Sequence, residues 1–197
     1  MPYYGESMRV CVYCGSSSGR GDYLSAAGQV GKALAEHGIE IVYGGARVGT
    51  MGALADAALA AGGTVIGVIP QHLVDWEVAH DRLTELHVVE TMHERKALMV
   101  DLADAFIGLP GGTGTLEEFL ETWTWAQLGL HPKPIGLLDV DGFFAHLIRF
   151  VDHMVEEGFV RQPYRDMLHV DDDLDRLLAR FVDYRPPNYK WADVPTP

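Results

Sequence analysis

The amino-acid sequence predicts an α/β fold: a single domain built on a doubly wound parallel sheet. Short apolar runs rich in β-branched residues alternate with amphipathic stretches along the chain, which is typical of a parallel sheet with right-handed crossovers. Two glycine-rich loops each follow an apolar run and open a helix, as happens at the carboxyl edge of such a sheet. The 197 residues contain no internal repeat and no linker, so one domain is predicted over residues 1–182. A proline-containing, irregular tail is predicted over residues 183–197.

Each strand is predicted from one apolar run. The runs are Arg9–Tyr13, Ile39–Tyr43, Thr64–Ile69, Leu86–Val89, Ala105–Leu109, Ile135–Leu138 and Met167–Val170. Helices are predicted between them, over residues 22–37, 51–61, 92–103, from 115 onward, over 143–157 and up to 181. Residues 71–85 are predicted as a loop with a short helix, which serves either as a substrate-facing lid or as a plain connector.

Capping residues and chain breakers bound several of these elements. Asp22 is predicted to cap the first helix, and the run Asp171–Asp173 to cap the last. Gly38 ends the first helix, and Pro70 ends the third strand. Metal binding by the aspartate run is a disfavoured alternative.

Composition excludes several classes of partner. The net charge of −13 and the lack of a basic stripe argue against nucleic acid. The sequence has neither a run of about 18 apolar residues nor a signal-like N-terminus, so we expect a cytoplasmic protein without membrane contact. The nine histidines are scattered without metal-ligand spacing, so no metal site is predicted.

The two cysteines, Cys11 and Cys14, are spaced like a redox pair. They lie in or at the end of a predicted strand, however, where residues three apart point to opposite faces. Packed thiols are therefore favoured over a redox role.

The stretch Pro110–Glu118, PGGTGTLEE, combines a strand end, a glycine turn and a helix start. Such a turn cradles phosphate, because glycines let backbone N–H groups approach an anion and the helix N-terminus adds positive potential. A second glycine-rich loop, Gly44–Gly52, also precedes a helix. Neither loop matches G-x-G-x-x-G or G-x-x-x-x-G-K-[ST], which disfavours dinucleotide hydride transfer and nucleoside-triphosphate hydrolysis. Phosphate recognition by backbone amides is predicted at both loops.

The helix after the central turn carries the first candidate catalytic group. Helical spacing predicts a core face formed by Leu116, Phe119, Leu120 and Trp123. Glu118 then points almost opposite, together with Glu121 and Trp125, and overhangs the glycine turn. Two interpretations stay open: a solvated helix face, or a carboxylate that acts on a bound substrate. Trp125 away from the core face favours a ligand or partner surface.

The helix over residues 92–103 carries a second candidate. Its apolar stripe, formed by Met92, Leu98, Met99 and Leu102, also includes Arg95. An unpaired buried guanidinium is costly. Arg95 must therefore reach solvent, pair with a carboxylate or meet an anionic ligand. Lys96 lies beside it in the sequence.

The motif PGGTGTLEE, with MHERK at Met92–Lys96, resembles the LONELY GUY (LOG) family of cytokinin riboside 5′-monophosphate phosphoribohydrolases. The resemblance runs from about Arg9 to Phe159 and includes YGG at Tyr43–Gly45 and WAQLG at Trp125–Gly129. It implies a Rossmann-like homodimer that needs no cofactor. It also implies cleavage of the N-glycosidic bond of N6-substituted AMP, giving the free base and ribose 5-phosphate, with AMP itself as a further substrate.

Residue by residue, the resemblance matches Arg95 and Glu118 to the family's catalytic pair, and Glu77 to a substrate-binding glutamate. Together with the phosphate argument, the predicted substrate-binding residues are Gly44, Gly45, Met51, Gly52, Glu77, Lys96, Gly111, Gly112, Thr113, Gly114, Thr115, Leu116 and Glu117. The alternative is a nucleotide-binding or carrier module without chemistry, which has no need of an arginine–glutamate pair.

Members of this family have also been labelled lysine decarboxylases. A pyridoxal enzyme requires a Schiff-base lysine with a pyridinium partner. The sequence has only four lysines, Lys32, Lys96, Lys133 and Lys190, and Lys96 is placed beside the predicted phosphate site. The sequence therefore argues against decarboxylation.

Overall fold

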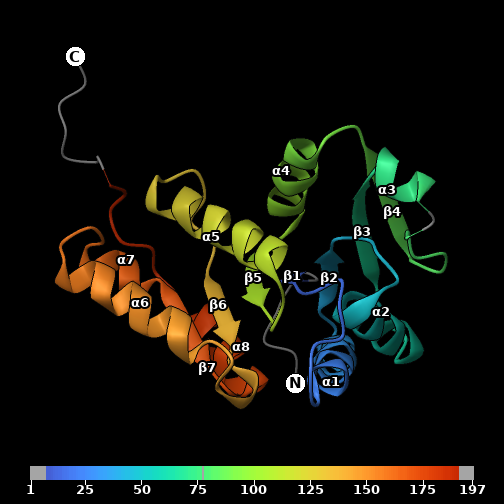
Figure 1. The fold of residues 1–197 in the computed structure, drawn as a ribbon, viewed down its shortest axis with the longest axis horizontal. Coiled ribbons are helices and arrows are strands. Elements are labelled where there is room, and N and C mark those ends of the chain that lie inside the picture. Colours follow the sequence, from blue (N-terminus) through green and yellow to red (C-terminus); the bar gives the residue numbers. More distant parts are fainter. Residues whose placement is uncertain (1–7, 77, 191–197) are drawn as a thin grey trace.

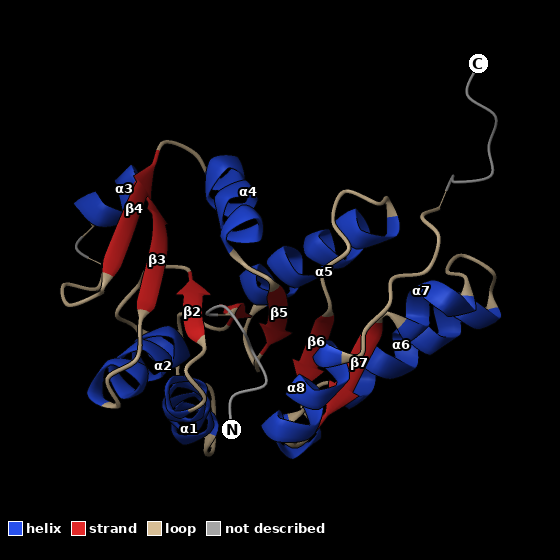
Figure 2. Cartoon of the chain, turned by 180° about the vertical axis from the view of Figure 1, so that it is seen from behind, coloured by secondary structure: helices blue, strands red, loops and turns tan. Residues whose placement is uncertain are grey.

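A seven-stranded parallel sheet runs through the molecule, and helices cover both of its faces (Figures 1 and 2). This is a computed structural model, and it describes residues 8–76 and 78–190. The strands are β1 Arg9–Tyr13, β2 Glu40–Tyr43, β3 Val65–Pro70, β4 Glu85–Val89, β5 Ala105–Gly108, β6 Ile135–Leu138 and β7 Leu168–Asp171. The predicted fold class is confirmed, and the predicted strands agree with these bounds to within one residue.

The helices alternate with the strands. They are α1 Tyr23–Glu36, α2 Gly49–Ala60, α3 Gln71–Asp75, α4 Met92–Leu102, α5 Thr113–Gln127, α6 Ala145–Glu156, α7 Gln162–Asp166 and α8 Leu174–Val182, with a 3-10 turn, η1, at Val140–Gly142. Two starts were predicted too late, because α2 and α5 begin inside their glycine loops, at Gly49 and Thr113. The one-turn helix α7 was not predicted, since five residues are too few to display a helical period.

The strand order is β4-β3-β2-β1-β5-β6-β7, so the chain changes direction across the sheet at β1. Val10 of β1 pairs with Ile41 of β2 on one side and with Ala105 of β5 on the other. Ligands of open parallel sheets bind at the carboxyl edge, where the strand order reverses. The loops that follow β1, β2 and β5 therefore meet at the expected position for a site.

Two apolar clusters fill the space on the two sides of the sheet. One packs side chains of α1, α2 and α8 against it, including Leu34, Leu54 and Phe181. The other packs α4, α5, α6 and α7, including Met99 and Phe119. Burial of these faces is the main source of stability.

The two cysteines belong to different clusters, Cys14 to the first and Cys11 to the second. The prediction that they point to opposite faces is confirmed. Both thiols are free and buried, and burial raises the pKa of Cys14 to about 12 and that of Cys11 still further. They are neutral packing groups, not a reactive pair.

Helix caps agree only in part with the sequence. Asp173 accepts a hydrogen bond from the N–H of Arg176 at 2.9 Å, so the predicted cap of α8 is confirmed. Asp22 does precede α1, but its side chain accepts no capping hydrogen bond. Its φ of −95° and ψ of 17° lie outside the extended region that capping residues adopt. The predicted N-cap position is therefore confirmed, but Asp22 does not cap the helix with its side chain.

Residues 183–190 contain no helix or strand, yet this segment is docked on the domain. The N–H of Lys190 donates to the carbonyl of Gln127 at 2.8 Å, and Arg161 donates to the carbonyl of Lys190 at 3.1 Å. The tail thus joins α7 to the end of α5. Within the described residues, no helix is long and apolar enough to cross a membrane.

The end of β7 carries a buried carboxylate that should stabilise the fold in a pH-dependent way. Asp171 accepts hydrogen bonds from Nε of Arg176 at 2.9 Å and the N–H of Asp173 at 3.1 Å, and Arg180 lies 3.3 Å away. Burial raises the pKa of Asp171, but these partners outweigh burial and hold its pKa below the ordinary value. A carboxylate with a lowered pKa stabilises the fold at pH values above its ordinary pKa. This contribution is lost as the pH falls through the lowered pKa.

We therefore expect Asp171→Asn to lower the free energy of unfolding by about 2 kcal/mol at pH 7, measured by urea denaturation. The difference from wild type should shrink as the pH is lowered below 4. Asp172→Asn is the matched control, because Asp172 also contacts Arg176 but is 77% exposed, and it should have little effect. A constant difference across the pH range would contradict this account.

Candidate active site

Three loops converge at the carboxyl edge of the sheet, and glycines let their backbones touch. A Cβ on Gly15, after β1, would lie 3.3 Å from Cα of Gly111, after β5. Gly49 has a φ of +59°, and a Cβ there would overlap with the backbone of Ser16. Thr50 ties two loops together, since its hydroxyl accepts from the N–H of Gly15 at 2.8 Å and lies 3.1 Å from that residue's carbonyl. Sequence reasoning did not identify this role of Thr50.

The central glycine turn presents free donors at the N-terminus of α5. Among the described residues, the N–H groups of Thr113, Gly114 and Thr115 have no hydrogen-bond acceptor, as expected for the first turn of a helix. Gly112, Thr113 and Gly114 are exposed, and a Cβ on either glycine would meet nothing within 4 Å. The turn is open to an anionic group, and the helix dipole of α5 favours one.

The second glycine loop offers fewer free donors. The N–H of Arg47 donates to Val78 at 2.9 Å, that of Met51 to Gly15 at 3.2 Å, and that of Gly52 to Val48 at 3.1 Å. The amides predicted at Met51 and Gly52 to bind substrate are therefore already engaged within the chain. Of the two predicted phosphate-binding turns, the turn at the start of α5 has more free N–H donors among the described residues.

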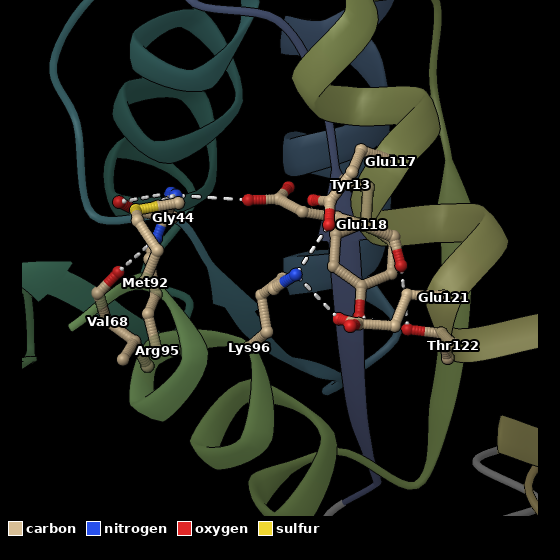
Figure 3. Close-up of polar contacts among 10 residues, drawn as sticks. All are labelled: Tyr13, Gly44, Val68, Met92, Arg95, Lys96, Glu117, Glu118, Glu121 and Thr122. Carbon is tan, nitrogen blue, oxygen red and sulfur yellow. Dashed lines mark hydrogen bonds and ion pairs between the residues drawn. The ribbon is translucent and has the colours of Figure 1, made fainter.

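Arg95 is fixed in a buried position by three different elements (Figure 3). Its Nε donates to the carbonyl of Val68 in β3, and its Nη2 to the carbonyl of Gly44 after β2, both at 3.0 Å. Its Nη1 donates to Oε1 of Glu118 at 3.0 Å. Pairing with a carboxylate was one of the three predicted solutions, and the structure confirms that one.

Glu118 does not lie on the face that helical spacing predicted. It is buried, with its side chain 11% exposed, on a stripe of α5 formed by Thr115, Glu118, Phe119, Thr122, Trp123 and Ala126. The helix wheel failed because Arg95 and Lys96 of α4 pair with carboxylates on the flank of α5 that was expected to be open. Trp125 is also partly buried, against the second apolar cluster, so it offers less free surface than predicted.

The environment of Glu118 prepares its carboxyl group for chemistry. Burial raises its pKa, and the charge of Arg95 works against this increase without cancelling it. Oε1 is held by Arg95, whereas no described residue donates a hydrogen bond to Oε2. One oxygen is thus aimed and the other is left for a ligand or water. An oriented carboxyl group with a raised pKa beside an anion-binding turn is typical of a catalytic site.

Lys96 forms a second ion-pair group next to the first (Figure 3). Its Nζ lies 2.5 Å from Oε1 of Glu117 and 2.9 Å from Oε2 of Glu121. Burial lowers the pKa of Lys96, but the two carboxylates outweigh this and raise it above the ordinary value. Two consecutive cations of α4 thus face three carboxylates of α5.

A capping box places these two cations at the start of α4. The hydroxyl of Thr91 accepts from the N–H of Glu94 at 3.1 Å, and the side chain of Glu94 accepts from the N–H of Thr91 at 3.4 Å. The signal, T-x-x-E at residues 91–94, is present in the sequence. It was not used in predicting where the helix begins.

A buried network of hydrogen bonds links α5 to Tyr13 of β1 and to His131. The hydroxyls of Tyr13 and Thr122 lie 2.8 Å apart, and Thr122 donates to the carbonyl of Glu118 at 3.0 Å. His131 reaches the carbonyl of Thr122 at 3.0 Å, and burial lowers its pKa, so it is a neutral donor there. These contacts anchor the turn of helix that carries Glu118.

Residues 71–85 are fastened to the second glycine loop. Ala46 and Ala79 form an isolated antiparallel bridge, and the N–H of His80 donates to Gly45 at 2.9 Å. The segment contains a short helix, α3, as predicted. Glu77, predicted to bind substrate, lies outside the described residues.

Two arginines near this edge were not identified from the sequence. Arg20 and Arg47 follow β1 and β2, and both are exposed. In the described structure, neither guanidinium makes a hydrogen bond or an ion pair. They supply unneutralised positive charge on loops that border the site, in a protein of net charge −13.

Comparisons with known proteins agree with this geometry. Residues 51–181 match a family model described as possible lysine decarboxylase. The cytokinin riboside 5′-monophosphate phosphoribohydrolase LOG of Oryza sativa subsp. japonica is 49% identical over 179 residues, covering 90% of this chain and 74% of its own. A cytokinin riboside 5′-monophosphate phosphoribohydrolase of Rhodococcoides fascians is 50% identical over 172 residues, covering 86% and 87%.

Solved structures with low identity share the fold. The molybdenum cofactor binding protein of Rippkaea orientalis has a TM-score of 0.68 at 20% identity, over 91% of this chain and 97% of its own. The molybdenum cofactor carrier protein of Chlamydomonas reinhardtii has a TM-score of 0.66 at 21% identity, over 88% and 99%. At such identity the likeness shows the fold alone.

The tight approach of Arg95 to Gly44 gives a test of this site. A Cβ on Gly44 would overlap with Nη2 of Arg95 and lie 3.2 Å from Sδ of Met51. We expect Gly44→Ala to lower the free energy of unfolding by about 2 to 3 kcal/mol, because it displaces a buried charge from its partners. Gly28→Ala is the control, since a Cβ there would make ordinary contacts at 3.7 Å. Equal urea midpoints for the two variants would contradict the described packing.

Proposed function

The chain belongs to the LOG family of cytokinin riboside 5′-monophosphate phosphoribohydrolases, and from this premise we propose that it is an N-glycosidase of nucleoside 5′-monophosphates. Its substrates are N6-substituted adenosine 5′-monophosphates and AMP. Water adds across the C1′–N9 bond, so that the ribose carbon gains the hydroxyl group and the departing base takes the proton. The products are the free base and ribose 5-phosphate.

The observation that carries this proposal is the buried pair of Arg95 and Glu118, 3.0 Å apart, beside the open N-terminus of α5. Loss of the base builds positive oxocarbenium character on the ribose. The carboxylate of Glu118 stabilises that charge and orients the attacking water through its free oxygen. The phosphate of the substrate occupies the turn at Gly111–Thr115, which places the ribose next to Glu118.

Arg95 acts by holding Glu118. A guanidinium stays protonated and cannot serve as a base. Three of its contacts are made with Val68, Gly44 and Glu118, which leaves it little capacity to bind a ligand. Its charge keeps Glu118 ionised in a buried place, and its geometry keeps the carboxylate aimed.

The lysines do not suit a pyridoxal-dependent decarboxylase. Lys96 is held between two carboxylates, and Nζ of Lys133 donates to the carbonyl of Val100 at 2.7 Å. Lys32 is 63% exposed on α1, where it pairs with Glu36. None of these three has the accessible, unpaired amine in a ligand site that a Schiff base needs.

The carrier module is the alternative. It is favoured only by solved structures near 20% identity, whereas the phosphoribohydrolases are near 50% identical. Release of free adenine from AMP separates the two functions. The homodimer and the cytoplasmic location stay predictions.

A requirement for the 5′-phosphate tests the role of the α5 turn. We expect AMP to be cleaved with a kcat/KM at least about 10²-fold above that of adenosine, because charge-assisted hydrogen bonds to the phosphate contribute roughly 1.5 to 3 kcal/mol each. Release of adenine measured by chromatography gives both rates. Equal rates for nucleoside and nucleotide would refute phosphate recognition at this turn.

Substitution of the ion pair tests the chemistry. Glu118→Gln and Arg95→Ala should each lower turnover of AMP by roughly 10²-fold or more, with circular dichroism confirming the fold. Glu117→Gln is the matched control, because Glu117 is the neighbouring carboxylate and is 54% exposed. Near-normal turnover by Glu118→Gln together with loss in Glu117→Gln would reverse the assignment.

A further inference from the structure

We propose that Lys96 is a positioning residue that acts on Glu118 through Glu117 and Glu121, and that it does not bind the phosphate of the substrate. This inference rests on the proposed N-glycosidase function and assigns a role to an ion-pair group that the reaction scheme has not used. It also gives Lys96 a different task from the substrate contact that the sequence predicted.

The contacts of Lys96 leave its ammonium group little freedom. Nζ lies 2.5 Å from Glu117 and 2.9 Å from Glu121, and its side chain is 9% exposed. An ammonium group has three N–H donors, and two are directed at these carboxylates. A phosphate that reached the third donor would lie beside both carboxylates, whose negative charge repels it.

The ion pairs align the helix α4 with the helix α5. Arg95 and Lys96 are consecutive in α4, and their partners Glu118 and Glu117 are consecutive in α5 (Figure 3). Glu121, one turn further along α5, completes the grip on Lys96. The lysine therefore fixes how α4 lies along α5, and so fixes the approach of Arg95 to Glu118.

The same pairing sets the charge around Glu118. The facing ionic groups are Arg95 and Lys96 from α4 and Glu117 and Glu121 from α5. Three titratable groups in or just after β1 also face it, Cys11, Tyr13 and Cys14, but burial raises the pKa of all three well above the ordinary values. They are neutral, so among the described residues the local charge comes from α4 and α5. Three carboxylates and two cations give a net charge of −1.

Removal of the lysine charge makes the cluster more negative. In Lys96→Met, Glu117 and Glu121 lose their counter-ion, so the ionised form of Glu118 is disfavoured and its pKa rises. The acid limb of kcat/KM against pH then moves to higher pH, and turnover on that limb falls by roughly tenfold. The double variant Lys96→Met/Glu117→Gln also lacks one carboxylate, so the net charge of the cluster returns to −1. The acid limb of its pH profile should return to the wild-type position.

A phosphate-binding lysine behaves differently in the same variants. Lys96→Met would then raise KM for AMP and leave the limb in place, and the added Glu117→Gln would restore nothing. The single variant Glu117→Gln is a further test that leaves every cation in place. It removes an anion beside Glu118, so our inference expects the acid limb to move to lower pH. A phosphate-binding lysine would be freed by this change, and KM would fall with the limb unmoved.

The experiment measures kcat and KM for AMP from pH 4 to 9 in the wild type, Lys96→Met, Glu117→Gln and the double variant. Lys32→Met is the matched control, because it removes one lysine charge at an exposed i, i+4 pair of α1 and should leave the limb unchanged. The titration of Glu118 is followed independently by carbon NMR of labelled glutamate carboxyl groups, assigned with Glu118→Gln.

The inference is supported if the acid limb moves in opposite directions in the two single variants and returns in the double variant. The NMR titrations of Glu118 must show the same shifts. A rise in KM with an unmoved limb and an unmoved Glu118 titration overturns it, while the proposed function stands. A wild type that releases no adenine refutes the proposed function. The NMR titrations still decide the role of Lys96 in that case.

Discussion

The buried contact between Arg95 and Glu118 is the interaction on which the rest of the site depends. Two charges are removed from water, and their mutual attraction offsets this cost only when the remaining donors are satisfied. Of the four other N–H groups of Arg95, two donate to the carbonyls of Gly44 and Val68. The guanidinium therefore joins the ends of β2 and β3 to α5, and Gly44 must lack a side chain at the point of contact.

The sheet topology makes this contact possible. Because β1 lies between β2 and β5, the loops after these three strands share one edge, and the turn before α5 approaches the loop after β1 at Gly111 and Gly15. Glycines at Gly15, Gly49 and Gly111 allow the loops to pack with backbone against backbone. This arrangement supplies positive potential in a protein of net charge −13. Its sources are the amides of α5 and the side chains of Arg20 and Arg47, which have no partner among the described residues.

The strands and the sheet class could be predicted from the sequence, because apolar runs are local signals. The need of Arg95 for a partner could also be predicted, because a charge on an apolar stripe is visible in the sequence. The face of Glu118 was predicted wrongly, since a helix wheel contains one apolar stripe and no information about a second helix on its flank. Burial of Lys96 was not foreseen either, because lysine is rarely buried unless it is paired, and its partners lie 21 and 25 residues away in the sequence.

The chemistry also explains why a carboxylate stands beside a turn that receives an anion. For a protein that only binds nucleotides, Glu118 would be a disadvantage, because its charge repels phosphate and its burial costs free energy. A carboxylate is useful there only when positive charge develops on the ligand, as it does on a ribose that loses its base. The fold is shared with a protein named as a cofactor carrier, at 21% identity, so the fold by itself does not decide between binding and catalysis. Burial of Glu118 costs free energy and does not help to bind an anion, so its presence argues for a hydrolase built on a fold that other proteins use for binding.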